Sequence, residues 1–290
     1  MAAQRLRERL GRGFLISGNA YGTALEPMGL APGQCPDLWN LERPEAVASV
    51  HRAYVEAGCD IIQSNTFAAG NPISAAKWGL RERLGELIAA GVRLAKEAAK
   101  DRAFVFVTTS PTGALLEPYG ALSPDAARAA FEEQAQLAAA AQPDALLYET
   151  FFAIEELEIA VRAAKATGLP VVATMTFDQG GRTSMGVSPQ QAARALEAAG
   201  ADVIGANCGT GPAAMEPVAL ALREATERPV MAQPNAGMSR LVAGRTEFPG
   251  TPEELADFAE RMVAAGIKIV GGCCGTTPEH LRAVVKRLRR

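Results

Sequence analysis

The chain is poor in cysteine, histidine and aromatic residues, and it carries no long hydrophobic run. Its 290 residues include 5 cysteines and 2 histidines, and 6% of them are aromatic. Five cysteines are too few for a disulfide scaffold, and an odd count leaves at least one thiol unpaired. No apolar segment approaches the ~18 residues of a membrane span, and the N-terminal segment is charged. These absences predict a cytoplasmic protein without a membrane partner.

The chain also has no excess of basic over acidic residues. The formal net charge is −3 and 21% of the residues are charged, so nothing favours a phosphate backbone as partner, and we expect no nucleic-acid binding. With 48% hydrophobic residues the chain has enough apolar side chains for a large core. Its length fits one α/β barrel, which takes ~250 residues plus insertions.

Short β-branched or aromatic runs alternate with long segments of helical periodicity, a pattern typical of parallel strands joined by crossover helices. The expected strands are 14–17, 60–64, 104–108, 145–149, 171–176, 203–206, 229–232 and 267–271. The expected helices between them include 82–100, 124–141, 154–167, 189–199, 212–226, 252–265 and 278–288.

The ends of these helices are well marked. Four helices begin with Ser-Pro or Thr-Pro, which combines an N-cap residue with proline at the first helical position. Several end in Ala-Gly or Thr-Gly, which suits a left-handed C-cap. No linker or low-complexity stretch divides the chain, and the segment after the first strand does not match the glycine-rich turn of a doubly wound sheet. We therefore predict a single (β/α)8 TIM barrel that spans residues 1–290.

Polar or soft residues follow several of the expected strands. Active sites of such barrels lie at the C-terminal ends of the strands. Glu149 follows the fourth strand, Cys208 the sixth, Asn235 the seventh, and Cys273 and Cys274 the eighth. Three thiols thus converge on one rim. Cys35 and Cys59 are expected to be small buried hydrophobic residues instead.

Three thiolates with a free fourth position are typical of a catalytic zinc site. Coordination lowers the pKa of a substrate thiol and presents a thiolate that attacks an electrophilic methyl group. The alternatives are buried structural thiols or a redox pair. Adjacent cysteines close only a strained ring on oxidation, and the glycines around Cys273 and Cys274 suit close approach to a ligand.

The segment 271–280, Gly-Gly-Cys-Cys-Gly-Thr-Thr-Pro-Glu-His, resembles the homocysteine S-methyltransferase family, and the shorter segments 148–150, 175–177, 207–208 and 234–237 support the resemblance. The resemblance implies that zinc is held by Cys208, Cys273 and Cys274, and that Glu149 binds the ammonium group of homocysteine. It also implies that other substrate contacts come from the rim loops, namely Asn19, Gly22, Thr23, Asn65, Thr66, Thr176 and Asn235. Asn235 is a candidate for the fourth zinc position in the absence of substrate.

The chain has two histidines, and it departs from the family's pattern at the end of the first strand. We expect His280 to belong to a helix cap, in which Thr276 and Glu279 have capping-box spacing, and His51 to lie at the surface. The family's first strand ends in Asp-Gly-Ala-x-Gly-Thr, whereas this chain has Gly18 and Asn19 in place of the first two residues. The missing carboxylate predicts weaker binding of homocysteine, or another thiol as the acceptor.

The resemblance implies an enzyme that methylates homocysteine to methionine. An alternative is a homocysteine-binding module of a cobalamin-dependent methionine synthase, which needs further domains, and a third is a zinc barrel that acts on another thiol or only binds one. The sequence contains no recognisable cobalamin-binding segment. The expected methyl donor is therefore a corrinoid protein, methylcobalamin or a sulfonium like S-methylmethionine, with a corrinoid slightly favoured by the segments 20–23 and 272–280.

Overall fold

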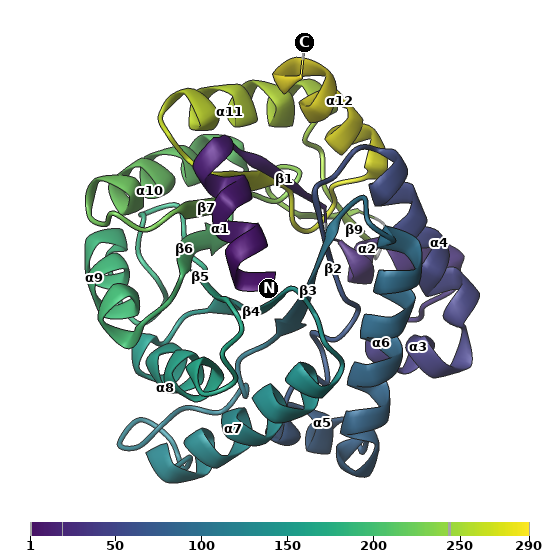
Figure 1. Ribbon diagram of the computed structural model, residues 1–290, viewed down its shortest axis with the longest axis vertical. Coiled ribbons are helices and arrows are strands. Elements are labelled where there is room, and N and C mark those ends of the chain that lie inside the picture. Colours follow the sequence, from purple (N-terminus) through teal and green to yellow (C-terminus); the bar gives the residue numbers. More distant parts are fainter. Residues whose placement is uncertain (1, 19, 243–244, 290) are drawn as a thin grey trace.

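A computed structural model describes residues 2–18, 20–242 and 245–289, and within these residues eight parallel strands close into a barrel (Figure 1). Neighbouring strands follow the order β1-β10-β7-β6-β5-β4-β3-β2. The strands are β1 (Leu15–Gly18), β2 (Ile61–Gln63), β3 (Phe104–Thr109), β4 (Ala145–Phe151), β5 (Val171–Met175), β6 (Val203–Asn207), β7 (Val230–Gln233) and β10 (Ile269–Gly271). All the predicted strands are confirmed, and so is the (β/α)8 TIM barrel.

Helices surround the barrel as the alternating pattern predicts (Figure 1). The main outer helices are α4 (Pro44–Glu56), α6 (Leu84–Ala99), α7 (Pro124–Ala140), α8 (Ile154–Lys165), α9 (Pro189–Ala199), α10 (Pro212–Glu224), α11 (Pro252–Ala264) and α12 (Pro278–Leu288). The predicted bounds of α9 and α12 are confirmed to the residue. The predicted helix 82–100 begins later than expected, because 3-10 helix η3 (Arg81–Arg83) precedes it.

Several elements were not predicted from the sequence. They are the N-terminal helix α1 (Ala2–Arg12), the short elements α2 (Tyr21–Leu25), η1 (Glu26–Met28), η2 (Pro36–Leu38), α3 (Trp39–Glu42) and α5 (Pro72–Lys77), and an antiparallel hairpin of β8 (Arg240–Val242) and β9 (Arg245–Glu247). Except for α1, they lie in the loops that follow β1, β2 and β7, on the side of the barrel where the strands end.

Helix α1 lies across the opposite end of the barrel, where the strands begin (Figure 1). Leu6 and Leu10 are one turn apart and therefore share a face of the helix. Both are buried in the cluster that fills the barrel, together with Leu15, Ile61, Phe104, Phe106, Ala145, Leu147, Val172, Val203, Met231 and Ile269. This end of the barrel is consequently packed with apolar side chains.

Aspartates that precede alternate strands attach α1 to the barrel. Asp60, Asp144 and Asp202 stand directly before β2, β4 and β6 and form ion pairs with Arg9, Arg5 and Arg7 of α1. The second carboxylate oxygen of each accepts a backbone N–H from the preceding strand region, at Ile16, Val105 and Val171 respectively. Each aspartate therefore accepts a hydrogen bond from a backbone N–H of a neighbouring strand and forms an ion pair with α1 at the same time.

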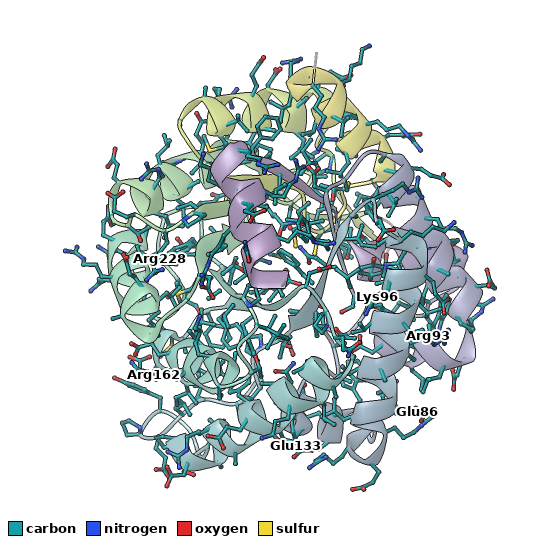
Figure 2. All side chains as sticks on the ribbon, viewed as in Figure 1. Glu86, Arg93, Lys96, Glu133, Arg162 and Arg228 are labelled. Atoms are coloured by element: carbon teal, nitrogen blue, oxygen red, sulfur yellow. The ribbon has the colours of Figure 1, made fainter. Side chains whose placement is uncertain are left out.

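The outer surface of the helical ring is charged. Figure 2 labels six of these charged residues on or beside the outer helices, namely Glu86, Arg93, Lys96, Glu133, Arg162 and Arg228. Pairs such as Arg93 with Glu97 and Arg162 with Glu158 follow i,i+4 spacing and contribute little stability each. Among the described residues, no helix combines the length and apolar character that crossing a membrane requires.

His51 is a correction to the sequence analysis. It was expected at the surface, but it lies on α4 with no exposed area, because α4 packs that face against the loop after β1. Its Nδ1 atom is hydrogen-bonded to the hydroxyl of Tyr21. Burial, and to a lesser extent the charge of Arg52, lowers the pKa of His51 to about 3, so the ring is neutral. Cys35 and Cys59 are buried, as predicted.

We predict that Asp202→Ala lowers the free energy of unfolding by about 1–3 kcal/mol, because Val171 N–H loses its acceptor. Burial raises the pKa of Asp202, but the hydrogen bonds from Lys165 and Val171 outweigh burial and leave it below its usual range. The stabilisation is thus present above the unfolded pKa of about 3.9 and is lost as the pH falls through the folded pKa. Urea unfolding at pH 7 and in steps below pH 4 measures both effects. Asp101→Ala, at an exposed position, is the control, and equal losses in the two variants would contradict the assignment.

Candidate active site

The side chains that point into the barrel change from apolar to polar along the strands. Alternate residues of a strand face the same side, so the positions two residues after the apolar inner layer also face inward. These positions hold Ser17, Gln63, Thr108, Glu149, Thr174 and Gln233. Gln63 donates to Gln233 Oε1 at 3.0 Å and to Ser17 Oγ at 3.3 Å across the interior. The polar layer forms the floor of a site at the C-terminal ends of the strands.

A cavity of about 340 Å³ lies at this end of the barrel. Its walls contain all three predicted metal ligands and, of the predicted substrate-binding residues, Glu149, Gly22, Thr23 and Asn65. The other described residues that line it are Ala20, Tyr21, Glu26, Pro36, Asp37, Ser64, Phe67, Ala68, Thr108 and Thr150. Thr66, Thr176 and Asn235 are not part of this lining, and Asn19 lies outside the described residues.

The three rim cysteines form a compact cluster. The Sγ atoms of Cys208, Cys273 and Cys274 all lie within 4.8 Å of one another, and those of Cys208 and Cys274 are 3.9 Å apart. Cys208 follows β6, whereas Cys273 and Cys274 follow β10. In the barrel order, β7 lies between these two strands. The prediction that the two segments meet on one rim is therefore confirmed by the geometry, and the cluster could hold a metal ion.

The end of β7 holds the two cysteine segments in place through backbone hydrogen bonds. Cys208 N donates to Gln233 O at 3.0 Å, and Cys273 N donates to Pro234 O at 2.8 Å. Ala236 N donates in turn to Cys274 O at 2.9 Å. Cys208 also has a left-handed backbone, with φ 59°, which is uncommon for a residue with a side chain and is typical of functional sites.

The electrostatics of the cluster favour a cation. Hydrogen bonds from Cys273 and Cys274 lower the pKa of Cys208, so one thiolate is stabilised by two neighbouring thiols. Contact with Cys208 raises the pKa of Cys273 and of Cys274, and burial raises both further. Three adjacent thiolates repel one another, so all three ionise together only when a positive charge lies among them.

Asn235 provides a further polar atom beside the cluster. Its Oδ1 atom is buried and has no hydrogen-bond partner among the described residues, and its side chain contributes to the lowered pKa of Cys208. Asn235 N donates to Thr210 O at 2.9 Å, which fixes the residue next to the Cys208 segment. A buried amide oxygen without a partner is costly, so the position suits a ligand or an ion.

Glu149 is buried near the cysteines and is supported by Asn207. Asn207 Nδ2 lies 3.3 Å from Glu149 Oε2, 2.8 Å from Thr150 Oγ1 and 3.8 Å from Cys273 Sγ. Thr174 Oγ1 donates to Asn207 Oδ1 at 2.7 Å and fixes the amide orientation. Burial raises the pKa of Glu149 to about 8, and the charge of Cys208 adds to the increase. A cation bound beside this carboxyl would hold it ionised.

The hydrogen bonds of four predicted substrate-binding residues are internal to the protein. Thr23 Oγ1 accepts from Gly275 N at 3.2 Å and so joins the loop after β1 to the cysteine segment. Asn65 Nδ2 donates to Pro36 O at 2.8 Å, and Thr66 Oγ1 donates to Thr108 O at 2.8 Å. Thr176 N donates to Phe151 O at 2.8 Å. These contacts shape the rim loops.

The predicted capping box is wrong by one residue. The N-cap of α12 is Thr277, and its partner is His280. Thr277 N donates to His280 Nδ1 at 3.2 Å, which leaves the proton on Nε2 to be donated to Gly250 O at 3.0 Å. Thr276 Oγ1 instead donates to Cys273 O at 2.7 Å and supports the cysteine segment.

Packing explains why residue 18, at the end of β1, carries no side chain. A Cβ atom at this position would lie 2.7 Å from Tyr54 Cδ1 and 2.8 Å from Cys59 Sγ. Both neighbours are buried, so neither can move cheaply. The packing of Tyr54 and Cys59 therefore excludes a carboxylate from this position.

Sequence reasoning did not identify Asp37 or Asn207 as site residues. Asn207 directly precedes Cys208. Alternate residues of a strand face the same side, so the inward orientation of Asn207, like that of Glu149, could have been predicted from its position in the strand. Asp37 lies in a proline-rich loop between β1 and α4, where periodicity gives no orientation. Its place in the cavity wall follows only from the structure.

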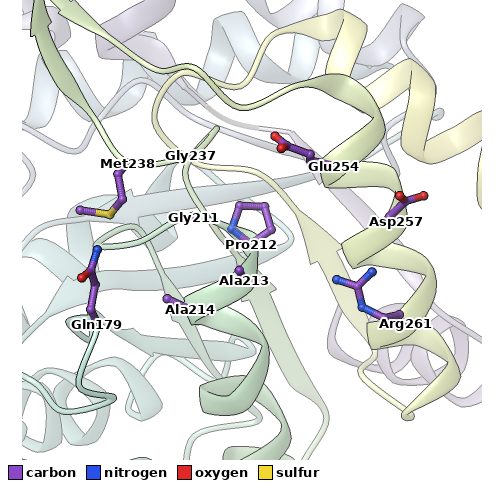
Figure 3. Close-up of a pocket in the computed structure, with 10 residues that line it drawn as sticks. All are labelled: Gln179, Gly211, Pro212, Ala213, Ala214, Gly237, Met238, Glu254, Asp257 and Arg261. Atoms are coloured by element: carbon purple, nitrogen blue, oxygen red, sulfur yellow. The ribbon is translucent and has the colours of Figure 1, made fainter.

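A larger cavity of about 420 Å³ lies outside the barrel mouth (Figure 3). It is bounded by Gln179, by the start of α10 at Gly211–Ala214, by Gly237 and Met238, and by Glu254, Asp257 and Arg261 along α11. Its charged groups already have partners within the protein: Arg261 pairs with Glu216, Asp257 with Arg287, and Glu254 accepts from Thr251 N. Among the described residues, none of the predicted site residues lines this cavity, so the candidate site is the cavity at the barrel mouth.

Comparisons with known proteins show the family of the chain. Residues 15–288 match the family described as homocysteine S-methyltransferase. The chain is 32% identical over 304 residues to methionine synthase from Mycobacterium leprae, covering 98% of the chain and 25% of that protein. It is 31% identical over 303 residues to betaine–homocysteine S-methyltransferase 1 from Danio rerio, covering 97% of the chain and 74% of that protein. The chain thus spans about a quarter of the length of the methionine synthase.

A solved structure shows the same fold. The metallated form of the homocysteine methyltransferase MmuM from Escherichia coli matches with a TM-score of 0.81 and 23% identity, over 99% of this chain and 100% of that one. The match to the family covers nearly the whole barrel, including the strand that carries Glu149 and the segments after β6 and β10 that carry the cysteines. The chain belongs to the homocysteine S-methyltransferase family.

Proposed function

We propose that the protein transfers a methyl group from a donor to the thiol of homocysteine and forms methionine. The bond between the methyl carbon and the donor breaks, a carbon–sulfur bond forms on homocysteine, and the thiol proton is released. The observation that carries the proposal is the cluster of three thiols beside buried Glu149 in one cavity. Family membership agrees with this chemistry.

The residues of the cluster fit zinc. Cys208, Cys273 and Cys274 offer three soft ligands, and the unpartnered Oδ1 of Asn235 offers a fourth donor in the resting protein. Zinc bound here would leave one exchangeable position and lower the pKa of a thiol that takes it. Three protein ligands with an exchangeable fourth position are typical of catalytic sites.

The remaining residues bind and orient the acceptor. Glu149 is the counter-charge for the ammonium group, and Asn207 fixes its carboxylate relative to Cys273 through the contacts described above. The side chains of Gln63, Gln233 and Ser17 are hydrogen-bonded to one another and form the floor of the site, which keeps water from the base of the cavity. The polar rim loops, including Gly22, Thr23 and Asn65, complete the wall around the acceptor.

The methyl donor approaches from the open side of the cavity. A corrinoid protein, methylcobalamin and a sulfonium like S-methylmethionine all present an electrophilic methyl group that suits a thiolate acceptor. We propose a cytoplasmic location for the reaction, since the described cysteines are all unpaired and thiols stay reduced in that compartment.

We predict about one zinc ion per chain and its loss in Cys273→Ser, since a hydroxyl is a poor replacement for a thiolate ligand. Metal analysis after dialysis measures the zinc content. Methionine formation is assayed with homocysteine and each donor in turn: S-methylmethionine, S-adenosylmethionine, betaine and methylcobalamin. Wild-type protein should form methionine with at least one donor, and Cys273→Ser with none.

Cys59→Ala is the matched control, because Cys59 is a buried thiol outside the cluster. It should keep its zinc and its turnover. The far-ultraviolet circular dichroism of both variants should match the wild type, since the packed barrel does not depend on the metal. Full zinc content and normal turnover in Cys273→Ser would refute the metal assignment.

Binding of homocysteine should also release a proton near pH 7. A free thiol has a pKa of about 8.5 and binds a proton at this pH, whereas a thiol coordinated by the metal is deprotonated. Calorimetry in buffers of different ionisation enthalpy measures the number of protons released. Metal-free protein is the comparison, and the absence of release from the zinc-loaded protein would count against coordination of the sulfur.

A further inference from the structure

The segment 272–276, here called the cysteine loop, carries Cys273 and Cys274 away from the end of β10. Its turn is closed from within, since Thr276 N and Thr276 Oγ1 both donate to Cys273 O, at 3.1 Å and 2.7 Å. Gly272 leaves room for this turn, because a Cβ atom there would lie 2.3 Å from Thr276 Cγ2. These internal bonds fix the shape of the loop, whereas its orientation toward the third thiol depends on contacts with the rest of the barrel.

Two side chains from other elements bind the far end of the cysteine loop. Tyr54, on α4, donates its hydroxyl to Thr276 O at 2.9 Å. Thr23, on α2, accepts from Gly275 N at 3.2 Å. Thr276 precedes the N-cap of α12, so its carbonyl lies outside the hydrogen-bond ladder of that helix. The backbone next to the thiols is thus held by residues that are distant in sequence.

Tyr54 reaches the cysteine loop past the end of β1. In the closed barrel β1 lies between β10 and β2, and α4 precedes β2. The ring packs against Gly18, where a Cβ atom would lie 2.7 Å from Tyr54 Cδ1. Tyr54 has no exposed area. A buried tyrosine hydroxyl is protonated at neutral pH and needs a partner, and the hydroxyl of Tyr54 has it in the cysteine loop.

The helices that carry Tyr54 and Thr23 are joined to each other. His51 lies nearly one turn before Tyr54 on α4, so both side chains share a face of that helix. Its Nδ1 atom is hydrogen-bonded to the hydroxyl of Tyr21, which lies on α2 with Thr23. Both His51 and Tyr21 are buried. Helices α2 and α4 therefore form one packed unit beside the cysteine loop.

The cysteine loop is held from two sides. On one side, the end of β7 binds Cys273 N and Cys274 O, through Pro234 O and Ala236 N. On the other side, α2 and α4 bind the next two residues of the loop. Four consecutive residues, 273–276, thus each make a backbone hydrogen bond to another part of the barrel. Such a loop has little freedom to turn its two thiols away from Cys208.

We infer that Tyr54 and Thr23 are positioning residues for the metal site, which hold the backbone at Thr276 and Gly275 so that the thiols of the cysteine loop point toward the ion. The inference rests on the proposed function, since it concerns the zinc that the three cysteines hold. Neither side chain belongs to the ligand set, and each acts through the backbone beside the ligands. Loss of either contact should weaken metal binding without removing a ligand.

The test removes one contact at a time. Tyr54→Phe deletes the hydroxyl and keeps the ring, and Thr23→Val deletes the acceptor and keeps the shape of the side chain. The zinc dissociation constant is measured by competition with a chromophoric chelator, in the absence of homocysteine and methyl donor. It should rise about 10-fold to 100-fold in each variant, the usual effect of losing a group that orients metal ligands.

Tyr148→Phe is the matched control. Tyr148 is also fully buried, and its hydroxyl donates to Gln134 Oε1 on α7 at 2.6 Å. It belongs to β4, which is opposite β10 in the closed barrel order. Tyr148→Phe therefore loses a comparable buried hydrogen bond at a distance from the cysteine loop, and it should keep the zinc dissociation constant of the wild type.

The absorption spectrum of the cobalt-loaded protein separates positioning from general stability. Charge transfer from thiolates to cobalt reports how the sulfur atoms bind the ion. Tyr54→Phe and Thr23→Val should change these bands, and Tyr148→Phe should not. A lowered temperature of unfolding in Tyr54→Phe, together with the zinc dissociation constant and cobalt spectrum of the wild type, would show that Tyr54 supports only the fold and would overturn its assignment.

The inference also fails if Tyr148→Phe weakens zinc binding as much as Tyr54→Phe does. If Tyr54→Phe lacks a cooperative thermal transition, Thr23→Val decides, because Thr23 is only partly buried and lies in a short rim helix. Zinc binding by the wild type with unchanged binding in the variants refutes only the positioning roles. Absence of zinc binding by the wild type refutes the proposed function as well.

Discussion

The hydrogen bonds that join the end of β7 to the segments after β6 and β10 hold the three thiols together, and the rest of the site depends on this arrangement. Cys208 and Cys273 donate to Gln233 and Pro234, so the strand between them sets their separation. Three half-buried thiols at this spacing cannot all ionise without a cation. Ionisation of all three would concentrate negative charge that a bound metal ion would relieve, and family membership is consistent with that use.

One end of the barrel stabilises the fold, and the other end carries the candidate site. At the end where the strands begin, α1 closes the barrel with Leu6 and Leu10, and the aspartates before β2, β4 and β6 hold it there. At the other end, the inward positions become polar, with Glu149 on β4, and the rim loops carry the cysteines. The apolar half can therefore support polar and strained residues such as Cys208 without loss of the fold.

The sequence predicts the barrel well because alternating strands and capped helices leave local signals. Strand ends also locate the cysteines and Glu149, since every parallel strand ends on the same face. The positions of residues that depend on contacts with distant parts of the sequence cannot be predicted in this way. The burial of His51 depends on the packing of α4 against the loop after β1, and the place of Asp37 depends on the N–H groups of Ala68 and Ala69. The charged helix α1 resembles a solvated terminus until its ion pairs with the barrel are seen.

The central claim is that the three clustered thiols bind zinc and leave one position for the acceptor sulfur. X-ray absorption at the zinc edge of the loaded protein, with and without homocysteine, tests it most directly. The account predicts three sulfur ligands at ~2.3 Å and one lighter ligand in the free protein, and four sulfur ligands once homocysteine is bound. Fewer than three sulfur ligands in the free protein, or an unchanged spectrum after saturation with homocysteine, would contradict it.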